Sequence, residues 1–180
     1  MDTKPAARAP SEQQRDKVVW SDRWSNLERC GYHLPLLTDS MIGGEIARRV
    51  EAELGADTAF LPILWIGAST HHSAFAGTVT SPNDLYIKVI EEVIESPIRG
   101  GFQRIFLLDS HVGNVVPANM ELQDVQLRYA PRMPDLWLTF ASWFATTAPA
   151  TAQIEGLYQG SISHACEWET SMIQEARRSL

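Results

Sequence analysis

The chain has 180 residues, of which 44% are hydrophobic and 21% are charged, and this balance predicts one globular domain with a substantial core. Its formal net charge of −7, without a cluster of Lys and Arg, disfavours nucleic acid as a partner. No apolar run approaches the roughly 18 to 20 residues of a membrane helix, and the first residues lack the apolar core of a secretory signal. We therefore expect a soluble cytoplasmic protein with no membrane partner, in which Cys30 and Cys166 are reduced thiols.

The first part of the chain predicts a tail, a strand and a helix. Residues 1–16 are rich in Ala, Pro, Ser, Gln and charged residues, which is typical of a flexible tail, and we expect the folded domain over 17–180. The apolar stretch 17–20 predicts a first strand. Apolar residues at every fourth position predict a helix that begins at Ser40 and ends at Gly55.

The middle of the chain predicts a second strand and a second helix. The stretch 60–67 predicts a buried strand, in which Pro62 would stand at the start or on a sheet edge. Residues 69–80 predict a loop. Ser81 is the expected N-cap of a helix whose apolar stripe lies within 85–94.

The remaining elements continue the alternation. The apolar run 104–108 predicts a strand of a parallel sheet that is covered on both faces. We expect a helix over 114–129, a strand with its outlet over 136–144 and a helix near the C-terminus. Strands that alternate with helices predict an α/β fold, a three-layer α/β/α sandwich with a mostly parallel central sheet.

Ligands in such sheets bind at the carboxyl ends of the strands. Asp109, His111 and Asn114 follow the predicted strand 104–108 directly, so we expect their side chains at that edge. A second polar stretch, LERCGYHLPLLTD (27–39), contains four possible metal ligands, which are Glu28, Cys30, His33 and Asp39. Alone, such a stretch is more often a polar surface loop. The imidazole of His111 and the carboxylates of SHACEWE (163–169) favour a metal site.

Two other kinds of site are excluded by their motifs. In GASTHHS (67–73) no glycine stands two places after the first serine, so the stretch is not a nucleophile elbow. The glycines of GGF (100–102) precede a predicted strand, whereas a phosphate-binding loop follows one.

Four stretches resemble, in order and spacing, motifs of the creatininase (creatinine amidohydrolase) family. They are LERCGYHLPLLTDS (27–40), GASTHHSAFAGTVT (67–80), GFQRIFLLDSHVGN (101–114) and SHACEWETS (163–171). The resemblance covers residues 17–175. It implies the three-layer fold, a metal-dependent hydrolase of cyclic amides, formamides or related C–N bonds, and a homo-oligomer, usually a hexamer. It also implies that the C-terminal part of the family fold is missing from this chain.

The resemblance implies two divalent metal ions (Zn, Mn or Fe) and assigns their ligands by position. Glu28, Asp39 and His111 match metal ligands, and Asp39 matches the carboxylate that bridges the two ions. Cys30 stands where the family has a metal-binding histidine, and Glu167 matches a glutamate that completes the second site. Two ions that share a carboxylate lower the pKa of a bridging water and polarise the carbonyl of the bond to be cleaved.

The resemblance also implies roles around a small-molecule amide substrate. His164 matches a histidine that moves protons near the scissile bond, where it could protonate the departing nitrogen, and Glu167 is the second expected catalytic residue. Trp143, His33 and His72 are expected on the substrate side.

Two departures from the family pattern leave alternatives open. Cys30 gives a softer ligand than histidine, and Val112 replaces a glycine, which would strain the backbone if φ were positive there. These departures motivate a second hypothesis, a family member without activity that binds metal or forms an oligomer. A third hypothesis is an α/β ligand-binding domain without metal.

Overall fold

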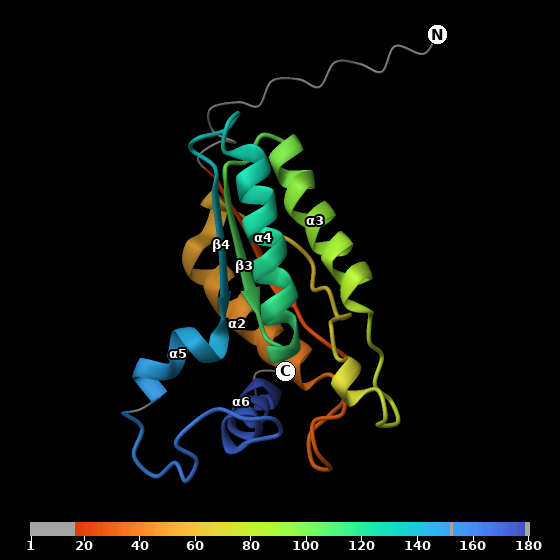
Figure 1. Ribbon diagram of the computed structural model, residues 1–180. Helices are drawn as coiled ribbons and strands as arrows, with labels where there is room; N and C mark the ends of the chain where they lie inside the picture. Colours follow the sequence, from red (N-terminus) through yellow and green to blue (C-terminus); the bar gives the residue numbers. More distant parts are fainter. Residues whose placement is uncertain (1–16, 152, 179–180) are drawn as a thin grey trace.

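The computed structural model describes residues 17–151 and 153–178, so the predicted tail over 1–16 lies outside the described residues. Within the described part, four parallel strands form one sheet in the order β2-β1-β3-β4 (Figure 1). The strands are β1 (Val18–Trp24), β2 (Thr58–Phe60), β3 (Arg104–Asp109) and β4 (Trp137–Ser142). The predicted parallel sheet is therefore confirmed.

Helices cover both faces of this sheet. Helices α3 (Asn83–Arg99) and α4 (Val115–Tyr129) lie side by side on one face, and α2 (Thr38–Leu54) lies on the other (Figure 1). The remaining helical segments are α5 (Trp143–Thr151), α6 (Glu167–Arg178) and the short 3-10 turns η1 (Gly55–Asp57), η2 (Thr70–His72) and η3 (Val112–Asn114). Each of the described helices is too short or too polar to cross a bilayer.

Strand β3 shows why both faces need a helical layer. Ile105 and Leu107 belong to the core beneath α3 and α4, whereas Phe106 and Leu108 pack in the core that contains Ile42 of α2. Successive residues of a strand point to opposite faces, so an apolar run of this length needs cover on both. The predicted three-layer sandwich is confirmed.

Helix α2 ends where the sequence predicts. Gly55 adopts a φ of 55°, which glycine tolerates best, and its N–H donates to the Glu51 carbonyl. The helix begins at Thr38, two residues earlier than predicted. Asp39 therefore lies in the first helical turn, where the helix dipole favours a carboxylate.

Helix α3 differs from its prediction in its cap, whereas most of its predicted apolar stripe is buried or packed against the core. The Ser81 hydroxyl donates to the Pro82 carbonyl and does not cap the helix, which begins at Asn83. Of the predicted stripe, Ile90 and Ile94 are fully buried and Leu85 is half exposed, and the buried face also contains Tyr86 and Ile98.

The predicted strand over 60–67 is wrong, and the predicted strand with its outlet over 136–144 runs into a helix. Strand β2 ends at Phe60, because Pro62 has no amide hydrogen for the ladder, and residues 61–67 continue as an irregular segment. Strand β4 ends at Ser142, and the apolar residues from Trp143 onward form α5. An apolar run alone does not distinguish a buried strand from a buried helix.

The carboxyl ends of β1 and β3 lie together. Trp24 pairs with Asp109, so the segments that leave the two strands begin side by side. Helix α6 packs against α2 at this end of the sheet (Figure 1). Residues 25–39, 110–114 and the start of α6 are therefore placed near one another.

Candidate metal centre

Three buried side chains from distant parts of the sequence meet at this edge. Glu28 lies in the loop after β1, Asp39 in the first turn of α2, and His111 directly after β3. The His111 Nδ1 atom lies 3.0 Å from Asp39 Oδ2 and 3.4 Å from Glu28 Oε1, and the three side chains are at most 4% exposed. The structure thus brings together two carboxylates and one imidazole in a space closed to bulk water.

Asn26 and Ser69 link these side chains by hydrogen bonds. Asn26 Nδ2 donates to Glu28 Oε2 at 2.7 Å and also to Ser69 Oγ, which in turn lies 2.8 Å from His111 Nε2. Both residues are fully buried. We call these five residues, Asn26, Glu28, Asp39, Ser69 and His111, the polar cluster. Each member holds the next in place, which fixes the directions of the donor atoms.

Charges inside the polar cluster shift pKa values. Burial raises the pKa of the Asp39 carboxyl, and the hydrogen bond from His111 opposes that rise. Burial lowers the pKa of His111, but the hydrogen bond to Asp39 and the charges of Asp39 and Glu28 outweigh it and raise this pKa to about 9. A proton on His111 therefore supplies the positive charge that the carboxylates need, and a divalent cation would supply more.

Asp109 joins the polar cluster to the neighbouring loop. Its Oδ1 accepts a hydrogen bond from Asn114 Nδ2 at 2.9 Å, and Asn114 Oδ1 accepts one from the Ala68 amide at 2.9 Å. Complete burial raises the pKa of Asp109 to about 8, so this carboxyl is neutral at pH 7. Asp109 acts here as a loop-positioning residue.

Three further imidazoles surround Glu28. His72, expected on the substrate side, has its Nδ1 atom 2.6 Å from Glu28 Oε2 and so is a direct partner of that carboxylate. His164 Nδ1 lies 3.5 Å from Glu28 Oε1, and its Nε2 donates to the Arg29 carbonyl at 2.9 Å. His71 stacks on His111 with ring centroids 5.9 Å apart, and burial, followed by the charge of His72, lowers the pKa of His71.

Two groups of three donors are close enough to hold an ion. In each group, one ligand atom per residue lies within 4.8 Å of the others, and the groups are Glu28, His71, His111 and Glu28, Cys30, His164. Glu28 is common to both. The resemblance implies that Asp39 bridges the two ions, and Glu28 is the residue that both of these donor groups share.

Cys30 is buried next to these carboxylates. Burial, followed by the charges of Asp39, Glu169 and Glu28, raises the pKa of its thiol well above the ordinary value. The thiol is therefore protonated in this state, and it must lose that proton to bind a metal.

Glu169, rather than Glu167, is the α6 carboxylate whose charge interacts with Asp39 of the polar cluster. The Glu167 carboxylate accepts hydrogen bonds from the Tyr158 and Gln159 amides at 2.8 and 3.1 Å. Glu169 is buried, and burial, then the charge of Asp39, raises its pKa to about 7. One sequence signal could have pointed to Glu169. Ile173, four residues later, lies on the same buried face of the helix, so the spacing indicates that Glu169 faces inward.

The strain expected at Val112 is absent. Val112 is 65% exposed in η3, and Ala165 is the one non-glycine residue in the described part with a positive φ. The adjacent Gly113 is the constrained position. A Cβ atom there would lie 2.3 Å from the Ala68 carbonyl oxygen and 2.5 Å from His111 Nε2, so only glycine fits.

The contacts described for Trp143 and His33 are with residues outside the polar cluster. Trp143 is 4% exposed, packs with Leu108, Phe144 and Trp168, and lines an apolar cavity of about 620 Å³. His33 is exposed, and its Nε2 lies 3.0 Å from Thr170 Oγ1.

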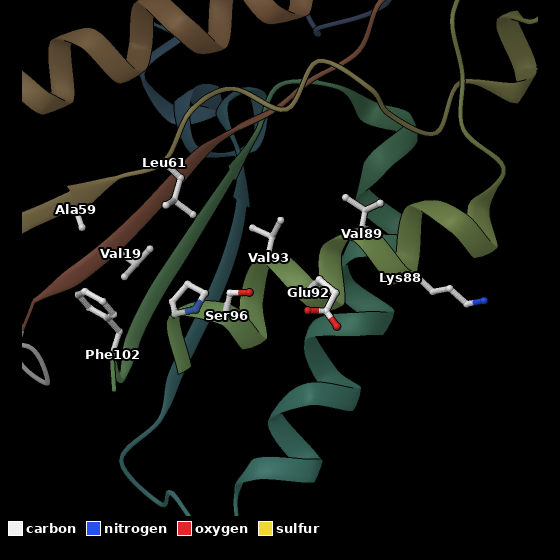
Figure 2. Close-up of a pocket in the computed structure, with 10 residues that line it drawn as sticks. Val19, Ala59, Leu61, Lys88, Val89, Glu92, Val93, Ser96 and Phe102 are labelled. Atoms are coloured by element: carbon white, nitrogen blue, oxygen red, sulfur yellow. The ribbon is translucent and has the colours of Figure 1, made fainter. Parts of the chain in front are cut away.

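An apolar groove elsewhere on the molecule carries none of this chemistry. It encloses about 630 Å³ between α3 and the β1–β2 side of the sheet (Figure 2). Val89 and Val93 of α3 face Val19, Ala59 and Leu61 across it (Figure 2). The titratable side chains in its lining are Lys88 and Glu92, so we place the candidate site at the polar cluster and not here.

The creatininase family model, described as creatinine amidohydrolase, matches residues 12–180. This chain belongs to the creatininase family. The match spans the polar cluster and all four strands. The resemblance seen in the four motifs is therefore confirmed at the level of the family.

Relatives and solved structures agree with this family assignment. Creatinine amidohydrolase of Pseudomonas putida is 24% identical over 157 residues, which cover 82% of this chain and 60% of the relative. Mycofactocin precursor peptide peptidase of Mycobacterium tuberculosis is 32% identical over 96 residues, 49% of this chain and 38% of the relative. A creatininase crystal structure superposes with a TM-score of 0.73 at 22% identity, covering 88% of this chain and 66% of the other. This creatininase-family chain thus spans less than two thirds of the curated relatives it matches.

The residues of the site fit a divalent metal ion. Two creatininase structures on this fold are described as a Zn–Zn type and a Mn form, with TM-scores of 0.72 and 0.71. In this creatininase-family chain the donors are carboxylate, imidazole and thiol, which together suit zinc and, through the carboxylates, manganese. The carboxylates are buried beside each other and need a cation, which is the electrostatic condition for a metal site.

Proposed function

We propose that this chain is a metal-dependent hydrolase that cleaves a C–N bond of a small amide, such as a cyclic amide or a formamide. The observation that carries the proposal is the convergence of Glu28, Asp39 and His111 in one buried cluster at the strand ends. The names of the relatives, an amidohydrolase and a peptidase, support a hydrolase of this bond class. A homo-oligomer, a hexamer by resemblance, and a cytoplasmic location belong to the same proposal.

We assign the metal ligands to residues of the polar cluster and to Cys30. Glu28, Asp39 and His111 would hold the first of two divalent ions (Zn, Mn or Fe), and Cys30 would contribute to the second. Bound ions of this kind polarise a carbonyl oxygen and lower the pKa of a water. Glu169 replaces Glu167 in this assignment, because the Glu167 carboxylate is held by two backbone amides.

His164 is placed to move a proton at its Nδ1 atom. Its Nε2–H donates to the Arg29 carbonyl, which fixes the ring and leaves Nδ1 as the exchanging nitrogen. This Nδ1 atom lies 3.5 Å from Glu28 Oε1. The His164 side chain is 39% exposed, whereas Glu28 is 2% exposed, so His164 stands between the cluster and solvent, where a departing nitrogen can be protonated.

The test is hydrolysis of a panel of small amides, with creatinine, formamides and short peptides, by the full chain loaded with Zn, Mn or Fe. We expect turnover that falls about 100-fold or more in His164→Gln, while the ion held by Glu28, Asp39 and His111 stays bound. The control is Glu51→Gln, which changes an exposed carboxylate of α2 outside the cluster and keeps full activity. Wild type that binds metal and hydrolyses none of the panel contradicts the proposal.

A second candidate function is a metal-binding family member without catalysis, and the buried protonated Cys30 favours it. The discriminating variant is Cys30→His. If the native chain is inert and Cys30→His hydrolyses an amide, the site has lost activity through this residue. Because Val112 is exposed and unstrained, Val112→Gly is the matched control and leaves activity unchanged.

A further inference from the structure

We propose that His71 is a metal ligand, which acts with Glu28 and His111 and gives this centre a preference for zinc over manganese. The proposal rests on the metal dependence of the proposed function but not on hydrolysis. It concerns a residue that lies in the second motif stretch (67–80) and to which the resemblance assigns no role.

The first observation is the distance between the donors. One ligand atom each of Glu28, His71 and His111 lies within 4.8 Å of the other two. Tetrahedral ligands about 2.1 Å from an ion lie about 3.4 Å apart, so a small rotation closes the set. His71 is exposed and can make that rotation, while Glu28 and His111 are held by the hydrogen bonds of the polar cluster.

The second observation is the anchoring of turn η2, which carries His71. The next residue, His72, has its Nδ1 atom 2.6 Å from Glu28 Oε2, and its amide donates to the Ser69 carbonyl at 2.9 Å. The Ser69 amide donates to Thr80 Oγ1 at 2.7 Å. The turn is therefore tied to the polar cluster on both sides of His71, which keeps the His71 imidazole beside His111.

The third observation is the space in front of the two rings. A Cβ atom at Gly113 would lie 2.5 Å from His111 Nε2 and 2.9 Å from His71 Cε1. Both imidazoles therefore approach the same point of bare backbone. A side chain at position 113 would push them apart.

The composition of the set points to zinc. With His71 the donors are two imidazoles and the carboxylates of Glu28 and Asp39, and imidazole is a preferred ligand of zinc, whereas manganese prefers oxygen donors. His71 adds the second imidazole. Without it, Glu28 and Asp39 outnumber the single imidazole of His111, and the set becomes rich in oxygen.

The test uses metal binding by the full chain, freed of metal with a chelator and titrated with Zn²⁺ and Mn²⁺ in competition with a chromophoric chelator. His71→Ala is compared with His33→Ala, which removes an exposed histidine outside the cluster. We expect His71→Ala to weaken Zn²⁺ binding at least about 10-fold and Mn²⁺ binding less, so that the preference for zinc narrows. Co²⁺ serves as a spectroscopic probe, and its visible absorption should change in His71→Ala only.

Equal Zn²⁺ affinity and equal Co²⁺ spectra of the two variants overturn the role of His71, whether or not the chain hydrolyses amides. If His71→Ala binds Zn²⁺ more weakly and the wild type shows no turnover, the role of His71 as a metal ligand is supported and the proposed hydrolase activity is contradicted. A wild type that binds none of these ions contradicts both.

Discussion

The core beneath α3 and α4 and the polar cluster at the strand ends are buried to nearly the same extent. Ile90 and Ile94 are 0% exposed, and so are Asn26 and Ser69, with Glu28 at 1%. The core is filled by apolar side chains, whose removal from water stabilises the fold. The polar cluster is filled by charged and hydrogen-bonding groups, whose removal from water costs free energy unless partners or a cation compensate it. Equal burial therefore has opposite energetic meaning in the two regions, and the costly one is the candidate site.

The largest expected effect is a change in stability at Asp109, a buried carboxyl beside the polar cluster, and it sharpens this comparison. Asp109→Asn should stabilise the protein at pH 7 by about 4 kcal/mol, because the folded-state pKa of Asp109 is raised to about 8. The unfolded chain loses this proton near pH 4 while the folded chain keeps it, so wild-type stability falls between those two values. Urea unfolding at a series of pH values measures the gain, which should vanish at pH 3. A variant no more stable than wild type at pH 7 shows that this buried carboxyl carries no such cost.

The next effect has the opposite sign and lies in the apolar core. Ile94→Ala should lower the free energy of unfolding by about 3 kcal/mol, because it leaves a cavity among fully buried side chains. Zinc content per folded chain should be unchanged, since Ile94 lies in the core and not in the polar cluster. If the variant folds but its zinc content falls together with its stability, the core and the polar cluster are not independent, which contradicts the comparison.

Addition of a cation should reverse the cost of the polar cluster. Zinc at about 100 times its dissociation constant should raise the free energy of unfolding of the wild type by about 2.7 kcal/mol. The thermal midpoint should rise accordingly, and a chelator should remove this rise. Glu28→Gln should lose this rise, because Glu28 belongs to both possible ion positions. Glu51→Gln, an exposed carboxylate on α2, is the matched control and should keep it. A rise of the same size in Glu28→Gln contradicts the assignment.

The smallest effect calibrates what a charge contributes outside both regions. Glu45 accepts hydrogen bonds from Arg48 and Arg49, which lower its pKa to about 2. Glu45→Gln should therefore destabilise the chain by at most about 1 kcal/mol at pH 7, as for other surface ion pairs. The depressed pKa means that this stability is lost as the pH falls from about 4.5 to about 2. A pH-independent difference between the two proteins would contradict an electrostatic origin.

The sequence predicts the fold well where one pattern has one meaning. The alternation of elements indicates the parallel sheet, and Gly55 marks the end of α2 because few other residues adopt its φ. Helix α5 was missed because the apolar run from Trp137 to Phe144 is compatible with either a strand or a helix. Its division at Trp143 depends on tertiary packing.

The candidate site was predictable at strand ends and less so on helices and turns. Glu28, Asp39 and His111 follow or begin regular elements, so topology alone brings them to one edge. Glu167 and Glu169 are two positions apart on α6, and a shift of two residues points a side chain to nearly the opposite face. Only the packing of α6 selects Glu169.

The most direct test of the central claim is a crystal structure of the zinc-loaded chain, with an anomalous difference map from data collected at the X-ray absorption edge of zinc. We predict a peak bonded to Glu28 and His111, with a carboxylate oxygen and an imidazole nitrogen about 2.0 to 2.2 Å from it. A map from zinc-loaded crystals with no peak at these two side chains would contradict a shared metal at the strand ends.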